Sequence, residues 1–294
     1  MIMDIREILN SPVEQKRFEN REIFIKRDDL LSDEFSGNKA RKFYFFLKNE
    51  FPNVEKIVSY GSNQSNAMYS LSVLAKMRGW EFEYYIDHLP AYLKSNPQGN
   101  YKYALRNGMK LIVGTPKPKR SELESDRVAF VEEGGRQEEA RVGLLQLARE
   151  IEIWQQSQNI EKLHIFLPSG TGTTALFLQQ SLSYRVKVYT VPCVGDSDYL
   201  RWQFNALDLN CANHPIILEP KKKYHFGKLY KESYHIWLKL KEEMGIEFDL
   251  LYDPVGWMTM MENSEIFSSP LLYIHQGGLI GNESMLMRYQ RRFP

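Results

Sequence analysis

Residues 163–174 carry the sequence LHIFLPSGTGTT. The apolar run 163–167 predicts a buried strand, and a helix is expected over 174–181, so small residues fill the turn between them. Small residues in such a turn let successive backbone N–H groups and hydroxyls surround a phosphate, and the helix dipole adds a favourable positive potential. The stretch therefore predicts a phosphate-binding turn, with a simple tight turn as the alternative.

The motifs that this turn lacks narrow the class of phosphate ligand. The turn does not end in Gly-Lys-Ser/Thr, as a nucleotide P-loop does, and it does not keep the Gly-x-Gly-x-x-Gly spacing of dinucleotide-binding turns. A nucleotide-dependent enzyme that uses residues 169–174 is therefore the weaker interpretation.

The rest of the chain alternates short apolar runs with longer segments of helical periodicity. Strands are predicted over 23–25, 56–60, 82–86, 110–113 and 186–191, and helices over 66–78, 100–106 and 137–156. Residues 114–135 lose this rhythm and are predicted as a loop-rich surface connection. Strands joined through crossover helices are typical of an α/β fold.

Two further polar segments lie at expected loop-to-helix boundaries. Residues 36–42 read SGNKARK, and glycine lets a neighbouring lysine approach a cofactor closely, so Lys39 is a candidate for a Schiff base. Residues 60–66 read YGSNQSN and follow a predicted strand, where helix N-termini present N–H groups to a carboxylate. The alternatives are solvated surface lysines in the first segment and plain helix capping in the second.

Composition excludes several classes of protein. Among 294 residues, 38 Lys and Arg face 37 Asp and Glu, and a formal charge of +1 disfavours nucleic-acid or anionic-membrane partners. Cys193 and Cys211 are too few for a disulfide scaffold, and no metal-ligand spacing links them with the six histidines, so no metal is expected. Early charges at Asp4, Arg6 and Glu7, with no apolar stretch of about 18 residues, favour a cytoplasmic protein.

In their order, these segments resemble the fold-type II pyridoxal-phosphate enzymes, specifically the 1-aminocyclopropane-1-carboxylate deaminase and D-cysteine desulfhydrase family. The matching segments are Ser11-Pro12-Val13-Glu14, Lys-Arg-Asp-Asp-Leu at 26–30, Gly-Asn-Lys-x-Arg-Lys at 37–42, Gln64-Ser65-Asn66, Gly134-Gly135, Ser-Gly-Thr-Gly-Thr at 169–173, Asp253-Pro254-Val255 and His275-Gln276-Gly277-Gly278. The resemblance implies a tryptophan synthase β-subunit-like α/β fold of two open, twisted, mostly parallel sheets with flanking helices. It also implies a larger cofactor-binding domain (1–41 and 148–294), a smaller domain (42–147) and a homodimer.

The resemblance assigns roles in binding pyridoxal 5′-phosphate. Lys39 would hold the cofactor aldehyde covalently until an incoming amino group displaces it, and the freed amine would then act as a base. Lys42 would assist the phosphate-binding turn, and Asn66 would hydrogen-bond the 3′-oxygen of the ring. The phosphate itself would rest on Ser169, Gly170, Thr171, Gly172 and Thr173.

The same resemblance places the substrate and the ring nitrogen. Ser65 would receive the substrate carboxylate or assist proton transfer, with Gln64 and Asn66 completing that pocket. Gln276 is the candidate partner of the ring nitrogen, with a structural loop hydrogen bond as the alternative. Because an amide donates to a neutral pyridine, this partner would favour elimination over transamination.

Two positions depart from the family pattern. A tyrosine near the substrate usually follows Asp-Pro-Val, whereas Gly256 stands there in this chain, and a second family tyrosine corresponds to Phe226. Tyr224 or Tyr230 are the candidates to replace the second phenol. Opening a cyclopropane ring needs a nucleophile or a proton at a carbon with no natural leaving group, so the loss of both hydroxyls harms that reaction more than β-elimination of a thiol.

The predicted function is therefore a pyridoxal-phosphate-dependent deaminase or lyase. Its substrate would be a small amino acid of the 1-aminocyclopropane-1-carboxylate or D-cysteine type, and its products ammonia and a 2-keto acid. The alternative is a catalytically silent cofactor-binding or interaction protein on the same fold.

Overall fold

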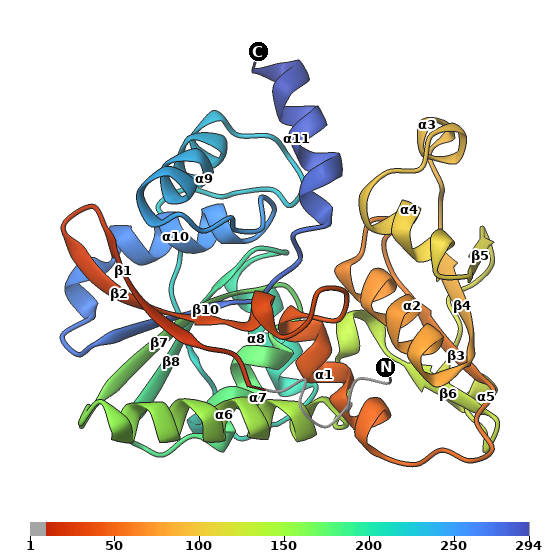
Figure 1. The fold of residues 1–294 in the computed structure, drawn as a ribbon, viewed down its shortest axis with the longest axis horizontal. Helices are drawn as coiled ribbons and strands as arrows, with labels where there is room; N and C mark the ends of the chain where they lie inside the picture. Colours follow the sequence, from red (N-terminus) through yellow and green to blue (C-terminus); the bar gives the residue numbers. More distant parts are fainter. Residues whose placement is uncertain (1–9, 294) are drawn as a thin grey trace.

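Two β-sheets organise the chain, of which the computed structural model describes residues 10–293 (Figure 1). The larger sheet has the strand order β1 (Val13–Phe18), β2 (Arg21–Arg27), β10 (Leu271–His275), β7 (Leu163–Ser169), β8 (Val186–Pro192), β9 (Ile216–Ile217). The smaller has the order β5 (Met109–Val113), β4 (Glu81–Ile86), β3 (Lys56–Tyr60), β6 (Val128–Val131). Only β1 and β2 pair antiparallel among the described strands. The predicted α/β fold with two mostly parallel sheets is confirmed.

Helices cover both faces of the larger sheet, as a mostly parallel sheet requires. One face packs against α6 (Ala140–Ser157), α7 (Thr173–Ser181) and α8 (Ser197–Asn205); the other packs against α9 (Lys231–Met244), α10 (Asp253–Glu262) and α11 (Gly281–Arg292). Successive side chains of β7 point to opposite faces, so Ile165 joins the first apolar cluster and Phe166 the second. The carboxyl end of β7 is thereby fixed between two layers of helices.

The smaller sheet has its own helices, and α1 lies between the two sheets (Figure 1). The helices of this half are α1 (Gly37–Lys48), α2 (Asn66–Arg78), α3 (Ala91–Ser95), α4 (Gly99–Arg106) and α5 (Arg120–Leu123). Single 3-10 turns lie at η2 (Asp28–Leu30), η3 (Glu133–Gly135), η4 (Cys211–Asn213) and η5 (Ser264–Ile266). Phe43 and Phe46 of α1 join the apolar cluster of this smaller sheet. The domain boundaries expected near 41 and 148 fall within α1 and α6, and the division stays a prediction.

One buried strand contradicts the sequence prediction. Residues 114–135 were expected to form a loop-rich surface connection, but residues 128–131 form β6 and pair in parallel with β3. Phe130 and Val131 are fully buried. Charged residues flank these four residues on both sides, so the apolar run is too short to show a strand period.

Two glycines fix the position of α1. Gly37 has a φ of +68°, and a Cβ at this position would overlap the carbonyl oxygen of Gln276, which follows β10. The second glycine, Gly143, belongs to α6. A Cβ there would overlap the carbonyl oxygen of Arg41, which lies farther along α1. Backbone therefore meets backbone at both contacts, and α1 sits directly against the end of β10 and against α6.

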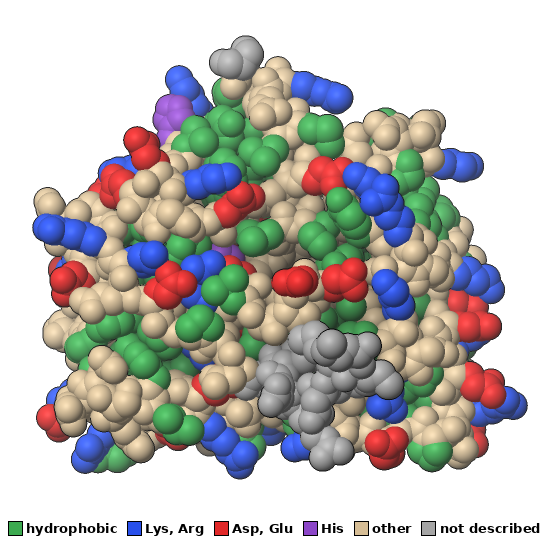
Figure 2. All heavy atoms as spheres, viewed as in Figure 1, with side chains coloured by type: hydrophobic (Ala, Val, Ile, Leu, Met, Phe, Trp, Pro, Cys, Tyr) green, Lys and Arg blue, Asp and Glu red, His purple; other side chains and the backbone are tan. Residues whose placement is uncertain are grey.

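The surface view shows charges of both signs interspersed over one face (Figure 2). This pattern agrees with the near-zero net charge of the sequence. None of the helices within residues 10–293 has the length and apolar character needed to cross a bilayer. Asp4, Arg6 and Glu7, on which the expected cellular location partly rests, lie outside the described residues.

We expect Gly37→Ala to destabilise the protein much more than Gly79→Ala. Gly79, which follows α2, has nearly the same φ (+70°), but a Cβ there would meet nothing within 4 Å. Alanine at either position would have to adopt the left-handed conformation, which costs about 1–2 kcal/mol. Only Gly37→Ala adds the overlap with the carbonyl oxygen of Gln276. Thermal unfolding measures the difference; equal losses in Tm would contradict the close contact at Gly37.

Candidate active site

A cleft of about 560 Å³, open to solvent, lies where the start of α1 faces residues from both sheets. Its lining includes Ser36, Asn38 and Lys39 from α1 and its approach, Asn66 and Asn100 from the smaller sheet's helices, and Gln276 after β10. Lys39, Asn66 and Gln276 were predicted as site residues from distant parts of the sequence. The fold brings these three to one cleft.

Lys39 stands in the first turn of α1 and is partly buried. Its Nζ lies 3.3 Å from Asn38 Oδ1. Burial lowers the pKa of Lys39 to about 8, and the carboxylate of Asp249 opposes that shift. A considerable fraction of the amine is therefore neutral just below pH 8, and a neutral amine can attack a carbonyl group.

Lys42 lies one helical turn beyond Lys39 and is buried. Its Nζ donates to the carbonyl oxygen of Gly134 at 2.9 Å. Burial, followed by repulsion from Lys39 and Arg136, lowers the pKa of Lys42 well below its ordinary value. Three basic side chains thus lie close to one another, and a bound anion would favour their charged forms.

The turn after β7 adjoins this group of cations. A Cβ on Gly134 would lie 3.1 Å from Thr171 Cγ2, which places the Lys42 acceptor beside the turn. Gly172 precedes α7 in a left-handed conformation and no side chain caps the helix, so its first N–H groups are open to a ligand. Among the described residues, Thr174 Oγ1 is buried without a hydrogen-bond partner. These donors fit a phosphate group.

Other hydroxyls of the turn have partners within the protein. Ser169 Oγ lies 2.7 Å from Thr190 Oγ1 on β8, and Thr171 Oγ1 lies 3.1 Å from Thr173 Oγ1. The side chain of Ser169 therefore braces the two strands. The prediction that Ser169–Thr173 hold a phosphate rests chiefly on the backbone N–H groups and on the threonines.

The loop before α2 leads directly to Asn66, which lines the cleft. Ser65 Oγ accepts hydrogen bonds from the backbone N–H groups of Ala67 (3.1 Å) and Met68 (3.4 Å), so Ser65 caps the helix and keeps its O–H to donate. The Gln64 amide nitrogen donates to Gln98 O at 3.1 Å. Its Oε1 is buried without a partner among the described residues. Capping and ligand binding are compatible at Ser65.

Gln276 links the two halves of the site. Its Oε1 accepts from Asn38 Nδ2 at 2.9 Å, and its Nε2 donates to Pro168 O at 2.7 Å. This pair of bonds ties the start of α1 to the end of β7. One N–H of the amide remains for a ring nitrogen, so the structural and the ligand-binding interpretations of Gln276 are compatible.

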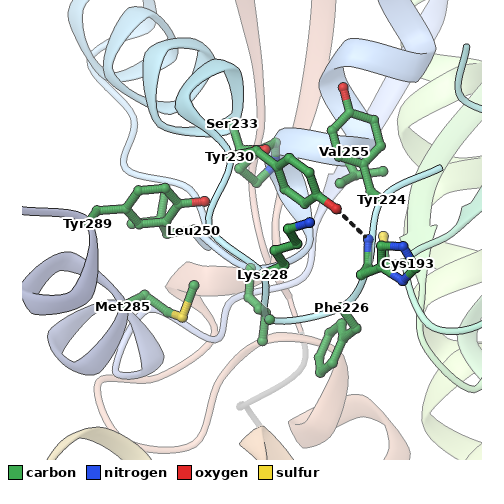
Figure 3. Close-up of a pocket in the computed structure, with 14 residues that line it drawn as sticks. Cys193, Tyr224, Phe226, Lys228, Tyr230, Ser233, Leu250, Val255, Met285 and Tyr289 are labelled. Carbon is green, nitrogen blue, oxygen red and sulfur yellow. Dashed lines mark hydrogen bonds between the residues drawn. The ribbon is translucent and has the colours of Figure 1, made fainter. Parts of the chain in front are cut away.

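The structure explains why Gly256 carries no side chain. A Cβ there would lie 3.0 Å from the Tyr273 hydroxyl and 3.3 Å from Pro168, so no aromatic ring fits. Phe226 lies in a second, aromatic pocket beside Cys193 (Figure 3). Trp257, beside Gly256, is fully buried in the core, as expected of a packing residue.

Tyr224 and Tyr230, the candidates for a replacement phenol, are engaged elsewhere. Their rings pack edge to face, with centroids 5.0 Å apart. The Tyr230 hydroxyl accepts from the backbone N–H of His225 at 3.0 Å (Figure 3), and the Tyr224 hydroxyl lies 3.7 Å from Met258 Sδ.

Tyr252 is a site residue that the sequence interpretation missed. A Cβ on Gly170 would lie 3.3 Å from the Tyr252 ring and 3.6 Å from its hydroxyl, so the phenol lies over the turn after β7. Phe226 packs on the same ring, with centroids 5.2 Å apart. Burial, with Asp249, Cys193 and Glu133 nearby, raises the pKa of Tyr252. The phenol therefore stays protonated at neutral pH and can donate a proton.

Asp249 is the second missed residue. It is buried in the segment 248–251, and its charge acts on Lys39. The sequence does carry a signal for it: Asp249 is a lone acid in the apolar sequence Phe-Asp-Leu-Leu, and burying an unpaired carboxylate is costly unless it has a function. Within residues 10–293, no group of three or more His, Cys, Asp or Glu side chains is arranged to hold a metal ion.

We expect Lys42→Gln to weaken sulfate binding by roughly tenfold or more, since a hydrogen bond to a charged group contributes about 1.5–3 kcal/mol. Sulfate keeps its charge near neutral pH, so any pH dependence belongs to the protein. Because the pKa of Lys42 is lowered, binding should take up a proton and strengthen as the pH falls. Calorimetry measures both effects, and Lys48→Gln at the exposed end of α1 is the control. Unchanged affinity in Lys42→Gln would exclude this anion site.

No family model and no curated protein matches the chain. Solved structures do: an ACC deaminase homologue aligns with a TM-score of 0.78 at 18% identity, over 96% of this chain and 93% of that one. O-acetylserine sulfhydrylase isoform 3 from Entamoeba histolytica aligns with a TM-score of 0.65 at 13% identity, over 93% and 87%. A threonine deaminase from T.th. aligns with a TM-score of 0.61 at 12% identity, over 91% and 92%. The resemblance drawn from the sequence motifs is thus confirmed in the fold, which is that of the fold-type II pyridoxal-phosphate enzymes.

Proposed function

We propose that this protein is a pyridoxal-phosphate-dependent deaminase or lyase that acts on a small amino acid and releases ammonia and a 2-keto acid. The observation that carries the proposal is the pairing of two amines on α1. Lys39 is partly buried with a lowered pKa, and Lys42, one helical turn farther along, donates to Gly134 beside the uncapped start of α7. The shared fold with an ACC deaminase homologue and a threonine deaminase supports the reaction class. We further propose that it works as a cytoplasmic homodimer.

The residues present fit the cofactor. Lys42 and the N–H groups at the start of α7 would hold its phosphate, Lys39 would bind its aldehyde, and Asn66 would hydrogen-bond its 3′-oxygen. When bound, pyridoxal phosphate supplies an electron sink that weakens the bonds at the α-carbon of an amino acid. Gln276 would donate its remaining N–H to the ring nitrogen, which suits elimination.

The chain's own residues would position the substrate and move its protons. The Ser65 hydroxyl and the N–H groups at the start of α2 are donors suited to a substrate carboxylate. Lys39, with a pKa of about 8, would accept a proton as its neutral amine and return it as the ammonium ion. The partly buried phenol of Tyr252 would donate a proton from above the turn, where Gly256 and Phe226 offer no hydroxyl.

Substrates of the D-cysteine and 1-aminocyclopropane-1-carboxylate type remain the two candidates. A thiol leaves readily, whereas ring opening needs a proton or a nucleophile at carbon. With one phenol at the turn instead of two, the site favours the thiol-releasing elimination.

We expect Lys39→Ala to abolish the visible absorbance of bound pyridoxal phosphate, because the covalent attachment is proposed at this amine and the neighbouring Lys42 Nζ is bonded to Gly134 O. Lys48→Ala, at the exposed end of the same helix, should keep the spectrum. Ammonia and sulfide assays on 1-aminocyclopropane-1-carboxylate, D-cysteine and L-cysteine then test turnover.

Four outcomes separate the candidate functions. Cofactor binding with turnover supports the enzyme, and cofactor binding without turnover of any small amino acid supports the silent binding protein. Failure of the wild-type protein to bind pyridoxal phosphate at saturating concentration would exclude both the enzyme and the silent binding protein. Stabilisation by a nucleotide alone would instead favour nucleotide chemistry at residues 169–174.

We expect Tyr252→Phe to lower kcat by roughly 100-fold, at the lower end of general acid–base contributions, while the cofactor spectrum is unchanged. Tyr224→Phe is the matched control, because that hydroxyl faces Met258. Steady-state rates on the best substrate of the panel measure the effect. A Tyr252→Phe enzyme with full activity would remove the phenol from the mechanism.

A further inference from the structure

Asp249 connects the two halves of the candidate active site. The residue is 4% exposed, and its Oδ1 accepts the backbone N–H groups of Leu251 (2.8 Å) and Tyr252 (2.6 Å). The side chain of Asn66, which belongs to the smaller sheet's half, lies beside this carboxylate and helps to stabilise its charged form. One buried carboxylate therefore joins the segment before α10 to the start of α2.

The orientation of the Asn66 amide follows from its other neighbour. Asn100 Nδ2 donates to Asn66 Oδ1 at 2.7 Å and to Gln64 O at 2.9 Å. Since Asn66 Oδ1 is the acceptor in that bond, its Nδ2 must be the donor toward Asp249. The carboxylate and Asn100 together fix which end of the Asn66 amide donates.

A missing side chain at Gly278 makes room for this contact. A Cβ there would lie 2.6 Å from Asn66 Nδ2 and 3.1 Å from Asp249 Oδ2. Gly278 lines the same cleft as Lys39 and Asn66. The backbone after β10 thus passes directly over the Asp249–Asn66 pair, beside the amine.

Titratable groups from four parts of the fold face this pair. They are Lys39 on α1, Tyr252 and Asp253 at the start of α10, Cys193 after β8 and Tyr273 on β10; Lys42, with Arg136 behind it, faces Lys39. Burial and then Asp249 raise the pKa of Asp253 well above its usual range, and its Oδ1 accepts from the Tyr273 hydroxyl at 2.6 Å.

Asp249 is the carboxyl of this cluster that carries charge at neutral pH. Burial raises the pKa of Asp249 to about 6, while two backbone N–H donors, Lys39 and Asn66 act against that rise. At pH 7 most of this carboxyl is ionised while Lys39 is still mostly protonated. The charge of the buried Asp249 carboxylate thus acts on a Lys39 amine that is itself mostly protonated.

We propose that Asp249 is a positioning residue of the candidate active site, whose carboxylate sets the charge of the Lys39 amine and holds the amide of Asn66 with its N–H donor toward the cleft. The proposal builds on the function proposed above, but its first part concerns the amine alone. It can therefore be tested with no cofactor present.

Competitive labelling with trace acetic anhydride over pH 6–10 tests the charge of Lys39. Mass spectrometry follows acetylation of Lys39, with Lys48 as the internal standard. The wild type should give a midpoint near 8 for Lys39. Asp249→Asn should move that midpoint down by at least about one pH unit, because an opposite charge no longer favours the ammonium form.

Two further variants complete the labelling experiment. Asp249→Ser is also neutral, and its hydroxyl can still accept from the backbone N–H groups of Leu251 and Tyr252, so it replaces Asp249→Asn if that variant fails to fold. Asp33→Asn removes one charge from the exposed lining of the same cleft and should leave the midpoint unchanged. The proposal would be overturned if a neutral variant at Asp249 kept the wild-type midpoint for Lys39 acetylation, or if Asp33→Asn shifted that midpoint equally.

Pyridoxal phosphate binding tests the role toward Asn66. Asp249→Asn should raise the Kd by roughly tenfold, and Asn100→Ala should raise it as well without moving the Lys39 midpoint. A wild-type protein that binds no cofactor would refute the proposed function and leave the labelling result standing. A normal Kd in both variants would refute the role of Asp249 in orienting Asn66.

Discussion

The candidate site depends on the ion pairs that the buried guanidinium of Arg41 makes with Asp28 and Glu150. Arg41 is fully buried, with Nη2 2.7 Å from Asp28 Oδ1 and Nη1 2.7 Å from Glu150 Oε1. Lys26 Nζ reaches the same Glu150 at 2.7 Å. Burial acts to raise the pKa of Asp28, yet Arg41 and Lys26 outweigh it and lower that pKa. These pairs fasten α1 to β2, to η2 and to α6 at once, and losing one partner of such a pair costs about 3–5 kcal/mol.

The position of Arg41 in the helix gives this network its importance for the site. Arg41 lies between Lys39 and Lys42 on α1. The rotation of α1 about its own axis that buries the guanidinium against α6 therefore also sets the directions of the two amines. Lys42 then reaches Gly134, and Lys39 reaches the cleft. The ion pairs thus hold the helix that carries both amines, and among the described residues no acid lies at hydrogen-bond distance from either amine.

Local sequence was enough to predict what depends on local periodicity and turn chemistry. The strand at 56–60 and the helix at 66–78 were predicted to the residue, since polar residues bound the first and Gly79 ends the second. The strand β6 was missed, because four residues carry no period. Lys39, Asn66 and Gln276 line one cleft: Asn66 follows β3 of the smaller sheet and Gln276 follows β10 of the larger one, so each lies at the carboxyl end of a parallel strand. Asp249 and Tyr252 were missed because only the path of the chain between the sheets brings them to Lys39 and to Gly170.

The contact at Gly143 limits how this protein can accommodate change. The carbonyl of Arg41 occupies the space of the missing side chain, so no rotamer can absorb a substitution there. A methyl group at Gly143 would displace α1 as a rigid rod. The amine at its first turn would shift by the same amount, although Gly143 itself lies outside the cleft lining. A residue outside the cleft thereby governs the position of the Lys39 amine within it.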